Sequence, residues 1–270
     1  DTVRATRQEE ERRLEAQRAE EAGGMLEGVT ALVTALPEDA PAGKLKKAAL
    51  MWALEDAKAS LEAGLGTEAV TTLTGLKQAT GRAIGRRVDP PAELMFPMPG
   101  LASNPYAQGV IGRAASVLRS KTLYKKGDEG YSQVSNAWSF STMGNNVYAA
   151  TWGLCYPESP HAADPELLIR VLRLLQAIFQ NHRDGDFNPG REAVHGRDPN
   201  INRFCFVPTF EAYLLLTATY PDLLLPSKRA EWLASAREAT EHQVRTYGIR
   251  ARNEPPHCYY ANMDVHYMLM

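Results

Sequence analysis

The sequence predicts an all-α fold built from antiparallel helical hairpins. Apolar residues recur at helical spacing through most of the chain. No segment alternates clearly in the manner of a strand, although a short ribbon fits at 131–140. Three helices are expected to begin at asparagines 56 and 60 residues apart, namely Asn146, Asn202 and Asn262. A helix pair that recurs at this length is typical of a helical array or a closed ring of hairpins.

Composition limits the class of protein. The 270 residues, 44% of them hydrophobic, suffice to bury a sizeable core. A formal net charge of −2 lacks the basic excess that a nucleic-acid partner requires, so we expect none. No uninterrupted apolar run reaches the roughly 20 residues of a membrane-spanning helix, so membrane insertion is not expected.

Cysteine usage and the two ends add further expectations. Cys155, Cys205 and Cys258 are too few and too far apart for a disulfide framework or a zinc site, so buried thiols are expected. The start at Asp1 fits either removal of a signal peptide or a trimmed chain. Because the chain ends within an apolar helical pattern, we expect the natural domain to continue beyond Met270.

The first third of the chain predicts an arm and a hairpin. Residues 1–22 are strongly charged and are expected to form a solvated helical arm, stabilised mostly by opposite charges three and four residues apart, with the main domain over 23–270. A helix follows from Lys44 and ends at 64–66, where two glycines flank a leucine. Thr67 is expected to cap the returning helix. The five prolines of 88–108 exclude a regular element there.

The second half predicts three Asn-led helices, the first two each followed by an amphipathic partner helix. A helix is expected over 145–156, with Asn145, either Tyr148 or Ala149, and Trp152 on one face. Asp164 and Pro165 have the residue types of an N-cap and a first helical position. Ser227 is expected to cap an amphipathic helix that reaches about Tyr247.

The links between these helices are asymmetric. Those that leave the Asn-led helices span about eight residues, whereas those that return to them span about thirteen to twenty. In consecutive antiparallel helices every second link emerges at the same end. The long polar loops over 181–202 and 248–260 should therefore gather on one face, and long ordered loops are usually functional.

This face would combine side chains able to donate, accept or transfer protons. They are Trp138, Asn145, Asn146, Tyr148, Trp152, His195, Asn200, Asn202, Arg203, His257, Tyr259, Tyr260, Asn262 and His266. Taken singly, each has a structural explanation, as a helix cap or as packing. The phosphate-loop, dinucleotide, HExxH and GxSxG motifs are absent. The acidic spacing of a calcium loop is not met at 182–190, which is expected to be a solvated turn.

The segments around 145–152, 195–206 and 257–267 resemble the helical-toroid polysaccharide lyases. The resemblance implies an incomplete (α/α) toroid over 44–270, within a catalytic domain at 23–270, and a secreted or periplasmic enzyme. Its substrate would be an acidic, uronate-containing polysaccharide cleaved by β-elimination. Several families of this class have Asn-Asn-His where this chain has Asn145, Asn146 and Val147. The base would therefore come from another loop.

The resemblance also implies roles for individual residues. Asn146 and Arg203 would neutralise the substrate carboxylate, His195 or His257 would be the base, and Tyr260 the acid or combined acid–base. The remaining positions would bind or orient the sugar, and they are Trp138, Tyr148, Trp152, Asn202, Tyr259, Asn262 and His266. This mechanism requires neither a metal nor a cofactor.

Three other functions fit the same pattern. A glycoside hydrolase on the same scaffold would use two carboxylates and water, but no spacing selects an acid pair here. A non-catalytic glycan-binding module would bind oligosaccharide without turnover. A helical-repeat interaction protein would use the asparagines only as caps.

Overall fold

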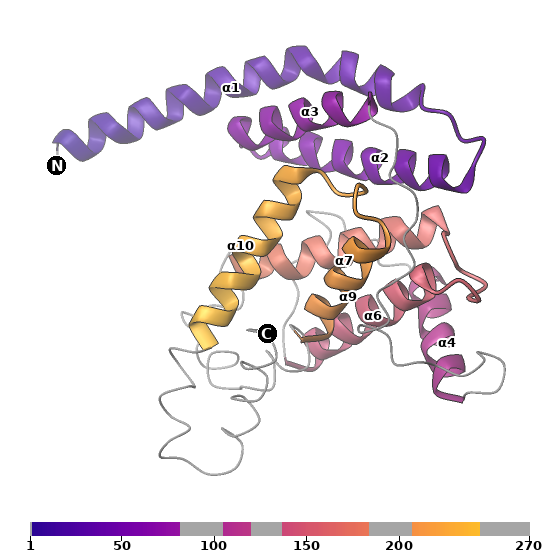
Figure 1. Cartoon of the computed structure of the whole chain (residues 1–270). Helices are drawn as coiled ribbons and strands as arrows, with labels where there is room; N and C mark the ends of the chain where they lie inside the picture. Colours follow the sequence, from indigo (N-terminus) through magenta and orange to yellow (C-terminus); the bar gives the residue numbers. More distant parts are fainter. Residues whose placement is uncertain (1, 82–104, 120–136, 184–206, 244–270) are drawn as a thin grey trace, which may run out of the picture. The chain divides into compact units, whose positions relative to one another are not determined.

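The computed structural model describes residues 2–81, 105–119, 137–183 and 207–243, and these form helices joined by short turns (Figure 1). The helices are α1 (Thr2–Thr34), α2 (Pro41–Glu62), α3 (Gly66–Thr80), α4 (Pro105–Arg119), α6 (Ala137–Cys155), α7 (Pro165–Arg183), α9 (Val207–Thr219) and α10 (Pro226–Gln243). No strand occurs within these ranges, which confirms the all-α prediction. None of these helices has the length and apolar character needed to cross a bilayer.

The chain divides into two compact units. The first comprises Asp1–Arg86 together with Asp222–Arg229, and the second comprises Arg87–Pro221 with Ala230–Met270. The first unit thus contains α1, α2, α3 and the first turn of α10. It is completed by residues that lie far away in sequence.

The first unit is a helical hairpin covered by a long helix. The α2–α3 hairpin turns at Gly64, whose φ of 75° favours glycine, as the sequence predicts. In Figure 1, α1 lies along α3, and the buried Ala22, Val29 and Val33 belong to this packed side of the unit. The small size of these side chains allows close packing of the helices. The arm boundary expected at residue 22 falls inside α1, which continues without a break to Thr34.

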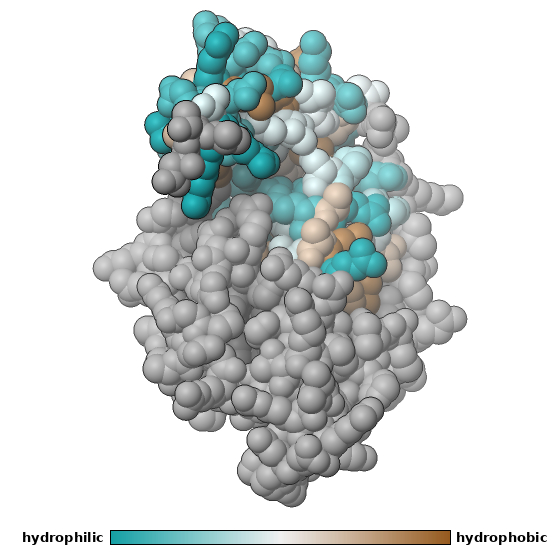
Figure 2. Space-filling view, turned by 90° about the vertical axis from the view of Figure 1, so that its left-hand side faces the viewer, coloured by the Kyte–Doolittle hydropathy of each residue, from teal (hydrophilic) through white to brown (hydrophobic). Residues whose placement is uncertain are grey.

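The exposed start of α1 is organised by charge. Residues 4–14 are all exposed, and Figure 2, viewed from the side of the N-terminus, shows mostly hydrophilic described residues at the top. Ion pairs three or four residues apart join Arg7 to Glu11 and Arg12 to Glu9. Such pairs were predicted from the sequence, and exposed pairs of this kind add little to stability.

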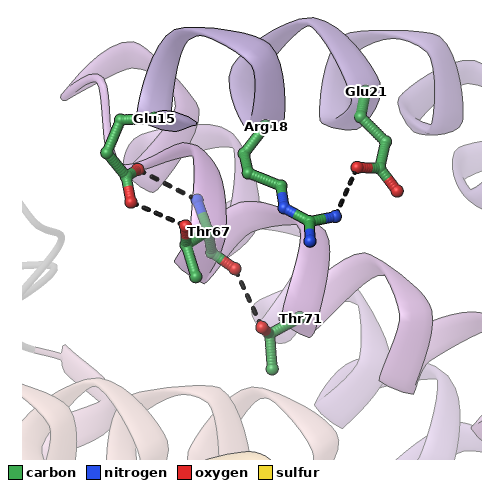
Figure 3. Close-up of polar contacts among 5 residues, drawn as sticks. All are labelled: Glu15, Arg18, Glu21, Thr67 and Thr71. Atoms are coloured by element: carbon green, nitrogen blue, oxygen red, sulfur yellow. Dashed lines mark hydrogen bonds and ion pairs between the residues drawn. The ribbon is translucent and has the colours of Figure 1, made fainter. Parts of the chain in front are cut away.

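The start of α3 is capped by a side chain from α1 rather than by its own threonine. The helix begins at Gly66, so the predicted role of Thr67 as N-cap is wrong. Instead the Thr67 backbone N–H donates to Glu15 Oε2 at 3.0 Å, and the Thr67 hydroxyl donates to Glu15 Oε1 at 2.6 Å (Figure 3). These hydrogen bonds lower the pKa of Glu15, since they favour its charged form.

A buried ion pair holds the late segment in the first unit. Lys228 Nζ lies 2.8 Å from Asp56 Oδ2 on α2, and the two side chains are 2% and 5% exposed. The ammonium also lies 5.9 Å from the centre of the Trp52 ring. Because α10 begins at Pro226, Ser227 lies inside its first turn, and the prediction that Ser227 caps it is wrong.

The second unit has a core centred on α6 and α7. Helix α6 packs against α4, α7 and α9, and most of α7 from Leu167 to Phe179 is fully buried. Trp232 of α10 stacks on Phe179 with ring centres 5.5 Å apart, and its indole N–H donates to Gln176 Oε1 at 2.8 Å. This hydrogen bond satisfies the indole inside an otherwise apolar core.

The sequence predicted the start of α7 correctly and the start of α6 incorrectly. Asp164 Oδ1 accepts the backbone N–H groups of Glu166 and Leu167, which confirms Asp164 as the cap before Pro165. By contrast, α6 begins at Ala137, so the ribbon expected at 131–140 is replaced by helix from 137. Asn146 consequently lies in the middle of α6 and does not begin it.

Replacing Glu15 by Gln should lower the free energy of unfolding by about 1 kcal/mol at neutral pH, because the negative charge at the start of α3 is lost. Solvent screening of this partly exposed group keeps the effect small. The wild-type pKa of Glu15 lies below its ordinary 4.5. Its contribution is therefore present above the ordinary value and lost as pH falls through the folded pKa.

Urea denaturation from neutral to acidic pH measures this effect. Glu20→Gln, an exposed change elsewhere on α1, is the matched control. Equal losses of stability in the two variants would contradict the capping role.

Replacing Lys228 by Met should destabilise the protein by about 3–5 kcal/mol, because the Asp56 carboxylate would remain buried without its counter-charge. Adding Asp56→Leu should recover most of this loss, since two apolar side chains can replace a buried ion pair at little cost. Chemical denaturation of the single and double variants measures both effects. The explanation fails if the double variant is as unstable as the single one.

Candidate functional site

The structure describes three of the predicted site residues with their side chains, and all three are on α6. They are Asn146, Tyr148 and Trp152. Trp138 lies in the first turn of the same helix, but its side chain is outside the described part. The other predicted site residues also lie outside the described residues, and they are His195, Asn202, Arg203, His257, Tyr259, Tyr260, Asn262 and His266. The candidate site is therefore limited to α6, where Tyr148 and Trp152 share a face and Asn146, two positions before Tyr148, lies on the opposite side of the helix.

Three aromatic side chains follow one another along this face at intervals of four residues. Tyr148 meets Trp152 edge-on with ring centres 6.3 Å apart, and Trp152 meets Tyr156 at 5.9 Å. The predicted shared face of Tyr148 and Trp152 is confirmed. Trp152 is only 5% exposed, whereas Tyr148 and Tyr156 are half-buried. A sugar ring would therefore reach the tyrosines more readily than the tryptophan.

The pKa of Tyr148 is raised above its ordinary value. Burial raises the pKa of Tyr148, the negative charge of Glu211 raises it further, and a hydrogen bond with Trp152 acts in the opposite direction. The phenol therefore keeps its proton at neutral pH. It can donate a hydrogen bond but is poorly suited to act as a base.

Glu211 was missed by reasoning from the sequence. It is half-buried on α9, which packs against α6, and it is the one charged residue in the α9 sequence VPTFEAYLLLTAT. The signal that could have identified Glu211 is that it is a single acidic residue in an otherwise uncharged helix. Its charge places an acidic group near the Tyr148 hydroxyl.

The two asparagines of α6 are more exposed than Val147, the residue that follows them. Asn145 is exposed and Asn146 is half-buried, while Val147 is fully buried. Because all three lie in the middle of the helix, neither asparagine is needed as a cap. Their amide groups remain candidates for contact with a ligand.

Among the described residues, no three His, Cys, Asp or Glu side chains are grouped closely enough to hold a metal ion. Open hollows of about 610 Å³ and 650 Å³ lie against α1 in the first unit. The first is lined by Gln8, Glu11, Arg12, Glu15, Ala16, Ala19 and Gly64. Neither hollow includes a predicted site residue.

Comparison with known proteins gives no match to a family model, to a curated protein or to a solved structure.

Replacing Glu211 by Gln should lower the pKa of Tyr148 toward its ordinary value of 10.0, because the carboxylate charge near the phenol is removed. Alkaline titration of phenolate absorbance, with and without Tyr148→Phe, isolates this tyrosine. Glu158→Gln, an exposed change in the link after α6, is the control. An unaltered Tyr148 titration in the Glu211 variant would rule out the electrostatic contact.

Proposed function

We propose that this protein cleaves a uronate-containing polysaccharide by β-elimination. The observation that supports it is the position of Asn146 and Tyr148, both half-buried, on α6, the helix whose sequence resembles the toroid lyases. An amide donor and a protonated phenol are suited to bind an acidic sugar. The proposed enzyme is secreted or periplasmic.

The proposed scaffold is an incomplete (α/α) toroid. Two pairs of consecutive helices support it. Helices α6 and α7 pack together across the short link 156–164, and α9 contacts α10 through the rings of Tyr213 and Trp232, 6.2 Å apart. Repeated hairpins of this kind would bring alternate loops to one end, where a groove could receive the polysaccharide.

In the proposed reaction the substrate carboxylate is neutralised first. The proton on the carbon beside a uronate carboxylate is weakly acidic until the developing negative charge is stabilised. The Asn146 amide and the Arg203 guanidinium would supply hydrogen bonds to that carboxylate. His195 or His257 would remove the proton, and Tyr260 would protonate the departing glycosidic oxygen.

The residues of α6 constrain this scheme. Val147, at the position where several toroid lyases have a histidine, is fully buried, so a base at this position would face the core. The raised pKa of Tyr148 favours hydrogen-bond donation to the sugar over proton abstraction. The negative charge of Glu211 would oppose a uronate carboxylate at Tyr148 itself. We therefore propose that the carboxylate lies toward Asn146.

Incubation with alginate, glucuronan, glycosaminoglycans and pectate should give new ultraviolet absorbance with one of these polymers. Elimination leaves an unsaturated sugar that absorbs there, whereas hydrolysis does not. New reducing ends without absorbance would indicate a glycoside hydrolase instead. Saturable oligosaccharide binding without any product would indicate a binding module.

With the responsive polymer, Tyr260→Phe should abolish turnover, because the variant has no proton to give the leaving oxygen. The free energy of unfolding should change by less than about 1 kcal/mol. Tyr106→Phe, the same change on another helix, is the matched control and should remain active. Full activity of the Tyr260 variant would move the acid role to Tyr259.

A further inference from the structure

An apolar groove runs beside the second half of α1 in the first unit. Its hollow measures about 650 Å³. The lining residues recur every three or four positions along one side of α1, with one residue from α2, and they are Gly23, Leu26, Glu27, Thr30, Ala31, Thr34, Ala35 and Lys58. This regular spacing means that a straight strip of α1 forms the wall of the groove. The inference below does not rest on the proposed lyase activity.

The threonine hydroxyls of the wall are already satisfied. The Thr30 hydroxyl donates to the Leu26 carbonyl at 2.7 Å, and the Thr34 hydroxyl donates to the Thr30 carbonyl at 2.8 Å. Neither proton needs a further acceptor. A partner in the groove would therefore meet apolar surface without leaving a buried donor unsatisfied.

Gly23 leaves space above the wall of the groove, and Gly24 and Gly28 leave space beside it. A Cβ atom added at Gly23, Gly24 or Gly28 would meet no heavy atom within 4 Å. A glycine inside a helix is destabilising relative to alanine. Nothing within the first unit approaches these positions closely enough to require glycine. They would allow the backbone of another helix to come near.

Two residues of opposite charge on the groove indicate which protein supplies the partner helix. Glu27 and Lys58 are both exposed, and neither forms an ion pair within the part of the chain that the structure describes. An interface between two identical copies uses the same surface patch twice. A patch with one unpaired acid and one unpaired base satisfies this condition, because Glu27 of each copy can meet Lys58 of the other.

We propose that two copies of this chain associate through the groove, with α1 packed against α1 about a twofold axis. The apolar strip supplies the buried surface, and Gly23 permits close approach at one end of it. The Glu27–Lys58 contacts, formed twice, fix the orientation of the two helices.

The full chain should sediment as a dimer, and Ala31→Glu should convert it to a monomer by placing a charge in the apolar strip. Ala31 is exposed in the single chain, so this change should leave the helical circular dichroism unaltered. Gln17→Glu adds the same charge at an exposed position of α1 outside the groove and should remain dimeric. A monomeric wild-type protein, or equal behaviour of the two variants, overturns the proposal.

Charge reversal tests the orientation separately. Lys58→Glu should raise the dissociation constant of the dimer at least about tenfold, because a glutamate would then face Glu27 at both symmetry-related contacts. Glu27→Lys combined with Lys58→Glu should restore the wild-type dissociation constant, as measured by sedimentation at several concentrations. Failure of the double variant to restore association overturns the pairing of Glu27 with Lys58. If Ala31→Glu does not fold, this comparison of the charge variants tests the proposed dimer by itself.

Discussion

The first unit depends on one buried ion pair between residues that are 172 positions apart. Asp56 and Lys228 are both removed from water, and either charge alone would be costly to bury. Their pairing requires residues 222–229 to return to α2. This return places Leu225 against Gly75, where a Cβ atom would come within 3.6 Å of the leucine side chain. The apolar packing around α2 and α3 is thus arranged about a polar contact.

The two units contribute different kinds of surface. The first presents a long charged helix and an apolar groove, both suited to contact with another protein surface. The second presents Asn146 and Tyr148 on opposite sides of α6, which is anchored in the core between them by Val147 and Thr151. Rigid support of this kind is what a binding site requires, since side chains held by a packed helix lose little freedom when a ligand arrives.

Local signals in the sequence predicted local structure. Asp164 caps α7 because its carboxylate reaches backbone groups two and three residues away, and Tyr148 meets Trp152 because both lie four apart on α6. The cap on α3 could not be predicted this way, since Glu15 precedes Thr67 by 52 residues. The start of α6 was missed although Asn136, a residue type favoured at N-caps, precedes Ala137, because the asparagines inside the helix also resemble a start signal. Most of the predicted site lies outside the described residues.

The return of residues 222–229 also affects the order of events during protein synthesis. A ribosome that has released only α1, α2 and α3 has made a bundle whose Asp56 still has no lysine. More than half of the chain must be synthesised after α3 before Lys228 is available to pair with Asp56. Domains usually fold as units from the N-terminus onward, so this nascent bundle would stay incomplete for an unusually long part of translation. A chaperone that shields α2 during that interval would have a defined moment of release.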